Sequence, residues 1–241
     1  MIADEKSQLF PHRRQKPFFI VLEGTDGSGK TEQFKRLTAG LIAGGFKVAT
    51  FDFPQYGSPS SYFVKEYLNG RYGGWKEVGP YKASLFYALD RFDVGRQIKE
   101  VLADGRIVIS NRYVGSNLGH QGSKIKNGVE RRKFFEWDYE LEYKILGIPR
   151  PDLNIILHVP AETAQGLVDK KGGREYIGGV KRDIHEADLN HLRAAERAYL
   201  EIAELFPKDF KLVECVENGR LLSIDEIHEK VLRVVQHFLK K

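Results

Sequence analysis

The chain has 241 residues, of which 41% are hydrophobic and 24 are glycine, and it carries a formal net charge of +5. This length is about one and a half typical domains, so we expect one domain whose core needs no cross-link. The composition excludes wholesale disorder, and a single cysteine, Cys215, excludes an internal disulfide framework and a four-cysteine zinc site. No apolar run is long enough for a secretory signal or a membrane span, which predicts a cytoplasmic protein without a membrane partner.

The basic charge favours an anionic partner, either a nucleic acid or a small molecule that carries phosphate. Residues 12–16 (HRRQK) would suit a nucleic-acid arm, but no aromatic or repetitive residues accompany them. We therefore interpret residues 1–17 as a flexible basic leader and do not expect a nucleic-acid partner. Residues 18–241 contain no internal repeat or linker and are expected to form a single domain.

Short apolar runs alternate with longer amphipathic stretches along this domain. We expect strands at residues 18–22, 46–51, 107–109, 153–159 and 210–213, and helices at residues 31–43, 83–103, 131–146, 184–206 and 224–239. This alternation predicts an α/β fold in three layers, with a five-stranded parallel sheet between two layers of helices. Because ligands of such sheets bind at the carboxyl ends of strands, we expect functional residues just after Leu22, Phe51, Ile109 and Val159.

Residues 24–31 (GTDGSGKT) follow the first strand and match the phosphate-binding pattern G-x-x-x-x-G-K-[ST] at every position. The glycines let backbone N–H groups turn toward a phosphate, and the following helix adds its positive end. Lys30 is expected to reach the β- and γ-phosphates, and the Thr31 hydroxyl to hold Mg²⁺. The pattern predicts a P-loop NTPase fold with an ATP site at Gly24, Thr25, Asp26, Gly27, Ser28, Gly29, Lys30 and Thr31.

Two competing motifs fail on spacing. A dinucleotide-binding G-x-G-x-x-G pattern starting at Gly27 would need a third glycine where Glu32 stands. A zinc-binding H-E-x-x-H pattern starting at His185 would need a second histidine where Leu189 stands. The sequence therefore favours neither a dehydrogenase nor a zinc protease.

A P-loop is shared by switches, motors and kinases, so other segments must decide the function. The guanine-reading N-K-x-D motif of GTPases does not occur in the sequence. The segments that do occur are, in chain order, 23–27 (EGTDG), 53–54 (FP), 85–91 (LFYALDR), 111–113 (NRY), 151–153 (PDL) and 199–201 (YLE). Over residues 18–240 this succession resembles the thymidylate kinase family of nucleoside monophosphate kinases.

The resemblance implies transfer of the γ-phosphate of ATP to dTMP, which gives dTDP for dTTP synthesis, with Mg²⁺ as cofactor and a homodimer packed through helices. It also implies that Tyr87 stacks on thymine, an interaction worth ~1–3 kcal/mol, and that Arg91 donates to thymine O4. It assigns the acceptor phosphate to Arg112 and the sugar 3′-hydroxyl to Asp26. Phe53, Ser116 and Gln121 are further expected contacts of the nucleotide.

Each of these residues also has a plain structural alternative. Tyr87 could be a core aromatic, and Phe86 beside it suits that role better. Arg91 could form a surface ion pair, Arg112 a structural salt bridge, and Asp26 could be an ordinary turn residue.

Residues 169–182 contain four glycines and a cluster of basic residues, and we interpret them as a mobile lid that excludes water during transfer. The family places its transition-state arginine either in the P-loop, after the acidic residue, or in the lid. Because Gly27 occupies the P-loop position here, Arg174 is the first candidate for that catalytic role and Arg182 the second. No general base is required, since a phosphate monoester is largely dianionic at neutral pH.

Two departures from the family pattern put the acceptor in question. Asn111 stands where the family usually has aspartate, so a contact to magnesium loses its negative charge. One alternative is that Glu23 or Asp26 supplies the missing charge. The other is that Thr31 and the nucleotide hold most of the metal's coordination. Residues 53–57 (FPQYG) lack the arginine that commonly binds the acceptor phosphate. Arg112 together with Lys65 or another basic group is the alternative.

Two rival functions stay open on the sequence alone. A deoxynucleoside kinase would phosphorylate a 5′-hydroxyl and would need a carboxylate base there, whereas the arginines and the basic lid favour a nucleotide acceptor. A non-catalytic nucleotide-binding protein would transfer phosphate to no monophosphate. Supplying thymidine and dTMP separately, with ATP and magnesium, distinguishes these functions.

Overall fold

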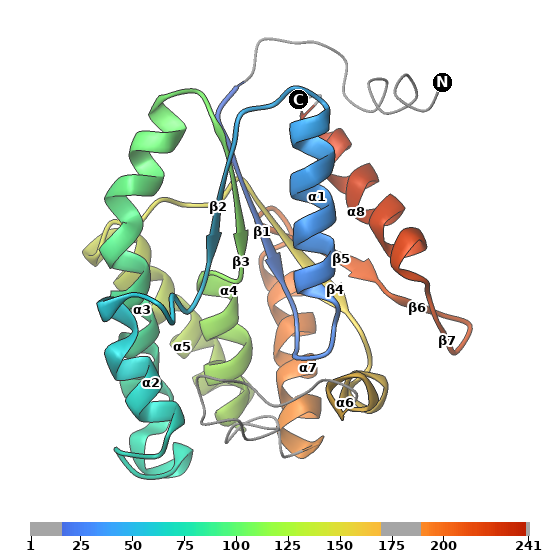
Figure 1. Ribbon diagram of the computed structural model, residues 1–241. Coiled ribbons are helices and arrows are strands. Elements are labelled where there is room, and N and C mark those ends of the chain that lie inside the picture. The colour runs from blue at the N-terminus through green and yellow to red at the C-terminus, as the bar shows by residue number, and fades with distance from the viewer. Residues whose placement is uncertain (1–15, 170–188, 240–241) are drawn as a thin grey trace.

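The computed structural model describes residues 16–169 and 189–239, and its centre is a five-stranded parallel sheet. Nearly all of the expected leader, and the expected lid with Arg174 and Arg182, lie outside the described residues. The strands follow the order β2-β3-β1-β4-β5 across the sheet (Figure 1). Their bounds are β1 Phe18–Glu23, β2 Val48–Asp52, β3 Ile107–Asn111, β4 Leu153–His158 and β5 Phe210–Glu214.

Helices cover both faces of this sheet (Figure 1). The pair α1 and α8 lies on one face, and α3, α5 and α7 lie on the other. The three-layer α/β fold predicted from the sequence is therefore confirmed. The helices are α1 Lys30–Ala43, α2 Tyr62–Leu68, α3 Trp75–Ala103, α4 Val114–Ser116, α5 Gly128–Tyr139, α6 Ala161–Asp169, α7 Leu189–Leu205 and α8 Ile224–Leu239.

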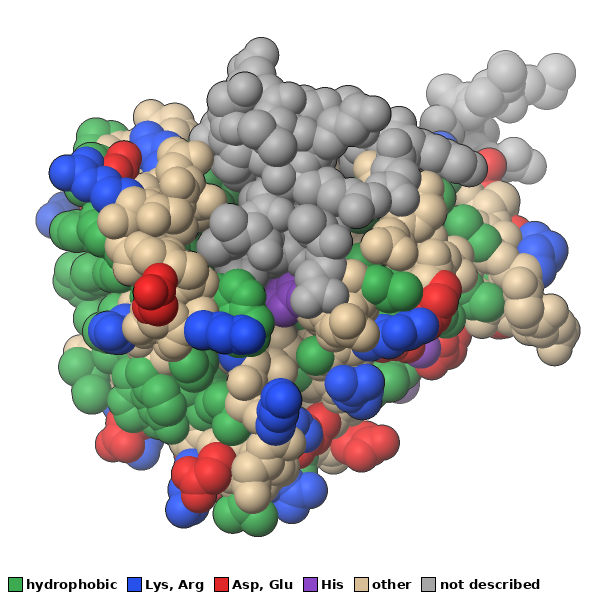
Figure 2. All heavy atoms as spheres, turned by 90° about the horizontal axis from the view of Figure 1, so that it is seen from below, with side chains coloured by type: hydrophobic (Ala, Val, Ile, Leu, Met, Phe, Trp, Pro, Cys, Tyr) green, Lys and Arg blue, Asp and Glu red, His purple; other side chains and the backbone are tan. Residues whose placement is uncertain are grey.

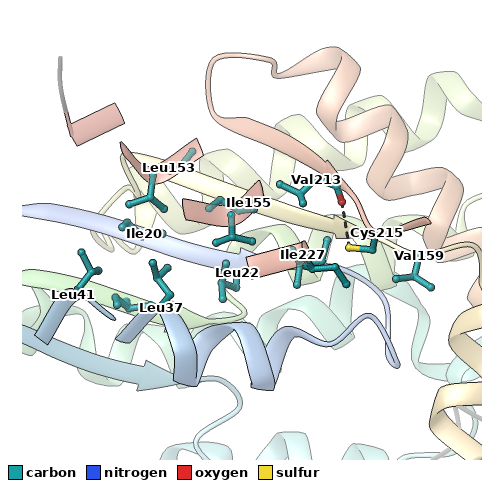
Figure 3. Packing of buried hydrophobic residues seen from close by; sticks show 14 of the residues in the cluster. Ile20, Leu22, Leu37, Leu41, Leu153, Ile155, Val159, Val213, Cys215 and Ile227 are labelled. Atoms are coloured by element: carbon teal, nitrogen blue, oxygen red, sulfur yellow. Dashed lines mark hydrogen bonds between the residues drawn. The ribbon is translucent and has the colours of Figure 1, made fainter. Parts of the chain in front are cut away.

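Alternate residues of the central strands enter two separate cores, because successive side chains of a strand point to opposite faces. Ile20 and Leu22 of β1 pack with Leu37 and Leu41 of α1 and with Ile227 of α8 (Figure 3). Their neighbours in β1 enter the second core, which contains aromatic side chains of α5 and α7. Both faces of β1 are buried from Phe19 onward and Phe18 is partly buried, which explains why residues 18–22 are a continuous apolar run.

Several elements differ from the sequence-based expectation. The helices α2 and α6 and a small hairpin, β6 Val216–Glu217 with β7 Arg220–Leu221, are not predicted. The expected helix at residues 131–146 is α-helical only to Tyr139 and continues as the π-helical segment Glu140–Ile145. Within α3, Gly79 has a non-helical φ of 75° and Pro80 follows it, so the helix is kinked at this point. The long regular part of α3 begins after the kink, a few residues before the expected start at 83.

None of the helices within residues 16–169 and 189–239 combines the length and apolar character needed to cross a membrane.

Candidate active site

The P-loop links the end of β1 to the start of α1. Gly24, Gly27 and Gly29 all have positive φ angles, of 138°, 84° and 85°. A Cβ at Gly24 would lie 2.6 Å from the Leu157 carbonyl oxygen, and one at Gly27 would lie 2.3 Å from the carbonyl oxygen of Ala164 in α6. Only glycine fits these two positions, so the predicted phosphate-binding turn has the local geometry that its sequence pattern requires.

Lys30 is held inside this turn. Its ammonium group donates to the backbone oxygens of Gly24 at 2.9 Å and Thr25 at 2.8 Å, and to the Ser28 hydroxyl at 3.4 Å. The lysine is buried, with 6% of its surface exposed. These contacts keep a positive charge in the turn, at the start of α1, where phosphate oxygens would enter. Thr31 follows in the first turn of that helix.

A cavity of about 390 Å³ opens beside the P-loop, at the carboxyl ends of β1, β2 and β3. Its size falls in the range usual for a small-molecule site. The segments after Leu22, Phe51 and Ile109 line it, as expected, whereas residues 160–168, the part of the segment after Val159 whose side chains the structure describes, do not. That segment leads into α6, which packs behind the P-loop at Gly27. The lining residues include Asp26, Gly27, Gly29, Lys30, Thr31, Phe53, Tyr87, Arg91, Arg112, Ser116 and Gln121.

Arg112 stands where β3 leaves the sheet, and it is one of two non-glycine residues with positive φ (66°) among the described residues. Its guanidinium forms an ion pair with Asp26 of the P-loop, and both side chains are largely buried (17% and 14% exposed). Burial lowers the pKa of Arg112, but the Asp26 carboxylate together with Tyr199, Glu23 and Tyr56 raises it by more, so the group stays charged. The arginine also donates to His120 Nε2 at 3.1 Å. Arg112 therefore connects the P-loop with the loop after β3.

Glu23, the last residue of β1, is a buried carboxylate that organises the same loop. It accepts hydrogen bonds from the Tyr113 N–H at 2.7 Å, the Ser116 hydroxyl at 2.7 Å and the Tyr199 hydroxyl at 3.3 Å. Burial raises the pKa of Glu23, and the hydrogen bond from Ser116 and the charge of Arg112 act in the opposite direction. With its oxygens occupied in this way, Glu23 fixes the backbone next to Arg112.

Tyr87 and Arg91 lie one helical turn apart on α3, and both line the cavity. Phe86 instead stacks on Phe63 of α2, with the ring centroids 5.7 Å apart. Arg91 is buried, with 2% of its surface exposed, and makes a two-pronged ion pair with Glu142 at 2.6 and 2.5 Å. The plain alternative for Arg91 is a surface ion pair. The ion pair is present, but its expected location is wrong, because the pair lies inside the protein.

The partners of Arg91 belong to a buried polar cluster around the π-helical segment. Asn117 donates from its Nδ2 to Glu142 at 3.1 Å and to Asp138 at 3.2 Å. Burial raises the pKa of Asp138 well above its usual range, and the nearby Glu142 carboxylate raises it further. The π-helical turn that begins at Glu140 brings these acidic residues toward Arg91 and Asn117, a recurrent use of such turns.

Sequence reasoning missed several residues that line the cavity. His120 follows Ser116 by four residues and Asn117 by three, and this helical spacing is the signal that could have found Asn117 and His120. Burial and the charge of Arg112 lower the pKa of His120 well below its usual range, so the ring is neutral and accepts the arginine N–H through Nε2. Asp52 at the end of β2 also lines the cavity.

The two departures from the family pattern have clear structural settings. Asn111 donates from Nδ2 to Asp52 Oδ1 at 2.9 Å. Gln55 is turned toward α3, where its Nε2 donates to the Asp90 carbonyl oxygen at 3.0 Å and its backbone N–H to the Asp90 carboxylate at 2.8 Å. Lys65 donates to the Tyr56 carbonyl oxygen at 3.2 Å and is not part of the cavity lining.

A lysine-bearing phosphate loop and a buried arginine that share one cavity at the carboxyl edge of a parallel sheet define a P-loop phosphotransferase. A family model for thymidylate kinase matches residues 22–230. The chain belongs to the thymidylate kinase family, whose members transfer a phosphoryl group from ATP to dTMP.

Individual relatives agree with this assignment. The chain is 31% identical to the thymidylate kinase of Mycobacterium tuberculosis (strain ATCC 25618 / H37Rv) over 76% of this chain and 85% of that protein. It is 34% identical to that of Caulobacter vibrioides over 79% and 84%. Among solved structures, thymidylate kinase from Candida albicans superposes with a TM-score of 0.71 at 21% identity and covers 92% of both chains, which supports the fold.

Proposed function

We propose that the cavity beside the P-loop is the thymidylate site and that its residues take the roles inferred from the family resemblance. The observation that carries this proposal is that Lys30 and Arg112 line one cavity from two different loops. In this arrangement the P-loop binds the ATP phosphates, Lys30 neutralises the transferring group, and Arg112 holds the acceptor phosphate. Family membership does not favour the deoxynucleoside kinase or the non-catalytic alternative.

Tyr87 and Arg91 form the base-reading side of the proposed site. Glu142 and the Tyr113 carbonyl oxygen use three of the five N–H donors of Arg91, which leaves two for a thymine carbonyl. Tyr87 supplies an aromatic face one turn earlier on α3. Ser116, Gln121 and Phe53 complete the contacts of the nucleotide in this proposal, and Asp26 takes the sugar 3′-hydroxyl.

Mg²⁺ enters this proposal with the nucleotide. Within the part of the chain that the structure describes, no cluster of three histidine, cysteine or acidic side chains could hold a resident metal ion. The oxygen-rich set of Thr31, Asp52 and Asn111 in the cavity lining suits a hard cation such as Mg²⁺ that phosphate oxygens also ligate. Bound there, the metal would neutralise charge on the β- and γ-phosphates. We retain Arg174, with Arg182 second, as the proposed source of the remaining positive charge.

A kinetic comparison tests the base-reading side. We expect Tyr87→Leu to raise the KM for dTMP about tenfold and to leave the KM for ATP unchanged, because only the thymine loses its stacking partner. Phe86→Leu is the matched control, since it truncates the adjacent aromatic on α3, which packs on α2. Equal rises in both KM values, or the same change in the control, would contradict this role for Tyr87. Turnover of thymidine in place of dTMP would contradict the proposed acceptor.

We also propose that the enzyme is a homodimer that pairs through α3. Four large apolar side chains on this helix recur every three or four residues and are 39–51% exposed; they are Tyr81, Leu85, Leu89 and Phe92. Viewed from below, hydrophobic side chains gather on the side of the molecule where α2 and α3 lie (Figure 2). A continuous apolar stripe of this kind is typical of an interface between protein chains.

Light scattering on size-exclusion chromatography tests the dimer. We expect Leu89→Arg to convert a dimer into a monomer, because it would bury two unpaired charges at the centre of a two-fold interface. Ile224→Arg, which changes an exposed apolar residue at the start of α8 on the other face of the sheet, should remain dimeric. A monomeric unmodified protein at micromolar concentration would overturn the proposal.

A further inference from the structure

The magnesium side of the proposed site lacks the acidic residue usual at position 111, and both candidates for compensation named above are engaged elsewhere. Glu23 receives three hydrogen bonds from Tyr113, Ser116 and Tyr199. Asp26 is paired with Arg112 on the acceptor side. The negative charge that a carboxylate normally places beside the metal must therefore come from a residue other than Glu23 and Asp26, or the site has no such carboxylate.

Asp52 is the acidic side chain that stands beside position 111. The two residues are direct partners in the register of β2 and β3, and Asn111 Nδ2 donates to Asp52 Oδ1 at 2.9 Å. Both line the cavity together with Lys30 and Thr31. Asp52 keeps solvent access there. Burial raises the pKa of its carboxyl above the usual value, and Asn111, Arg112 and Lys30 offset only part of this rise.

The orientation of the Asn111 amide follows from this contact. An ionised carboxylate accepts hydrogen bonds only, so Asn111 must turn its NH₂ group to Asp52 and its oxygen away. Asn111 is 7% exposed, and its Oδ1 is buried with no hydrogen-bond partner among the described residues. Leaving a buried amide oxygen without a donor costs free energy, so this oxygen is available to bind a cation or another ligand.

We propose that Asp52 supplies the negative charge that faces the nucleotide-bound magnesium ion, with Asn111 Oδ1 as a neutral oxygen beside it. The acidic function has moved from β3 to the neighbouring residue of β2, and the hydrogen bond from Asn111 holds the carboxylate in place. This inference rests on the proposed function, in which Thr31 and the ATP phosphates bring the metal to this edge of the sheet.

Mn²⁺ binding to the enzyme–ADP complex, followed by electron paramagnetic resonance, tests the inference without turnover. We expect Asp52→Asn to weaken Mn²⁺ affinity about 10-fold or more, as loss of a metal-site carboxylate or its supporting partner usually does. ADP binding in the presence of EDTA, measured by calorimetry, should be unchanged. In the double variant Asp52→Asn with Asn111→Asp, the charge returns to position 111, and Mn²⁺ affinity should recover to nearly the starting value.

The matched control is Asp104→Asn, which makes the same chemical change at an exposed position after α3, next to the start of β3 and away from the cavity. If Asp52→Asn unfolds, as thermal denaturation would reveal, Asp52→Ser takes its place in the same titration. Unchanged Mn²⁺ affinity in the single variant, or no recovery in the double variant, would overturn the role of Asp52. Failure of the unmodified enzyme to tighten Mn²⁺ binding to ADP would instead overturn the proposed metal position itself.

Discussion

Arg174→Ala is expected to lower kcat by about 10³-fold or more while the Kd for ATP stays nearly unchanged. The physical reason lies in the P-loop. A Cβ at Gly27 would lie 2.3 Å from the Ala164 carbonyl oxygen, so no arginine fits at the P-loop position. Lys30 and Arg112 line the cavity from fixed places, and Arg91 is tied to Glu142. The transition-state charge is therefore expected from the glycine-rich segment at residues 169–182.

Single-turnover kinetics with ATP and dTMP, beside calorimetric titration of ATP, would check this expectation. Arg182→Ala serves as the comparison, since it removes the same charge from the second candidate. Equal losses in ATP affinity and kcat would indicate a ground-state contact, and an effect confined to Arg182→Ala would identify that residue as the one that acts.

Arg112→Met is expected to lower kcat/KM for dTMP roughly 10²-fold, which corresponds to a loss of about 3 kcal/mol of transition-state stabilisation. The reason is that the acceptor phosphate loses a charge-assisted hydrogen-bond partner in a largely buried site. The substitution also leaves Asp26 beside the phosphate without its counter-charge. Arg112→Lys restores the charge but not the forked geometry, so it should recover only part of the loss. Steady-state kinetics with dTMP varied at saturating ATP would measure both variants.

A control separates this effect from loss of fold. Arg150→Met removes another arginine, which pairs with Asp209 far from the cavity lining, and it should leave the kinetics unchanged. Thermal unfolding of each variant shows whether the protein remains intact. If Arg112→Met changed the KM for ATP as much as that for dTMP, Arg112 would belong to the structural framework and not to the acceptor site.

Much of the fold could be predicted because its signals are local. A buried parallel strand is a short continuous apolar run, and the P-loop is one contiguous pattern whose glycines have the φ angles that the pattern requires. The family and the three-layer architecture are confirmed on this basis. The assignments of Tyr87, Arg91 and Arg112 to individual roles stay predictions, although all three side chains line the expected cavity.

The parts that sequence reasoning missed depend on partners far apart in the chain. Arg91 contacts Glu142, which lies 51 residues later in a π-helical turn. The spacing of hydrophobic residues in the sequence does not predict this turn. Asp52 gains its setting from Asn111, 59 residues away, because β2 and β3 are neighbours in the sheet. The spacing of residues along a sequence indicates which side chains share one face of a helix or strand. It does not indicate which strand is the neighbour of another in the sheet.

In the proposed site, the ion pair between Asp26 and Arg112 joins the loop assigned to the phosphate donor to the loop assigned to the acceptor. A nucleotide that rearranges this pair would therefore change the affinity of the site for the other nucleotide. Thermodynamic linkage then requires reciprocity: the factor by which bound dTMP changes the affinity for ATP equals the factor by which bound ATP changes the affinity for dTMP. Under the proposed roles, a change in this one ion pair would make the two substrates cooperative ligands of each other, with a sign that depends on whether the pair tightens or loosens.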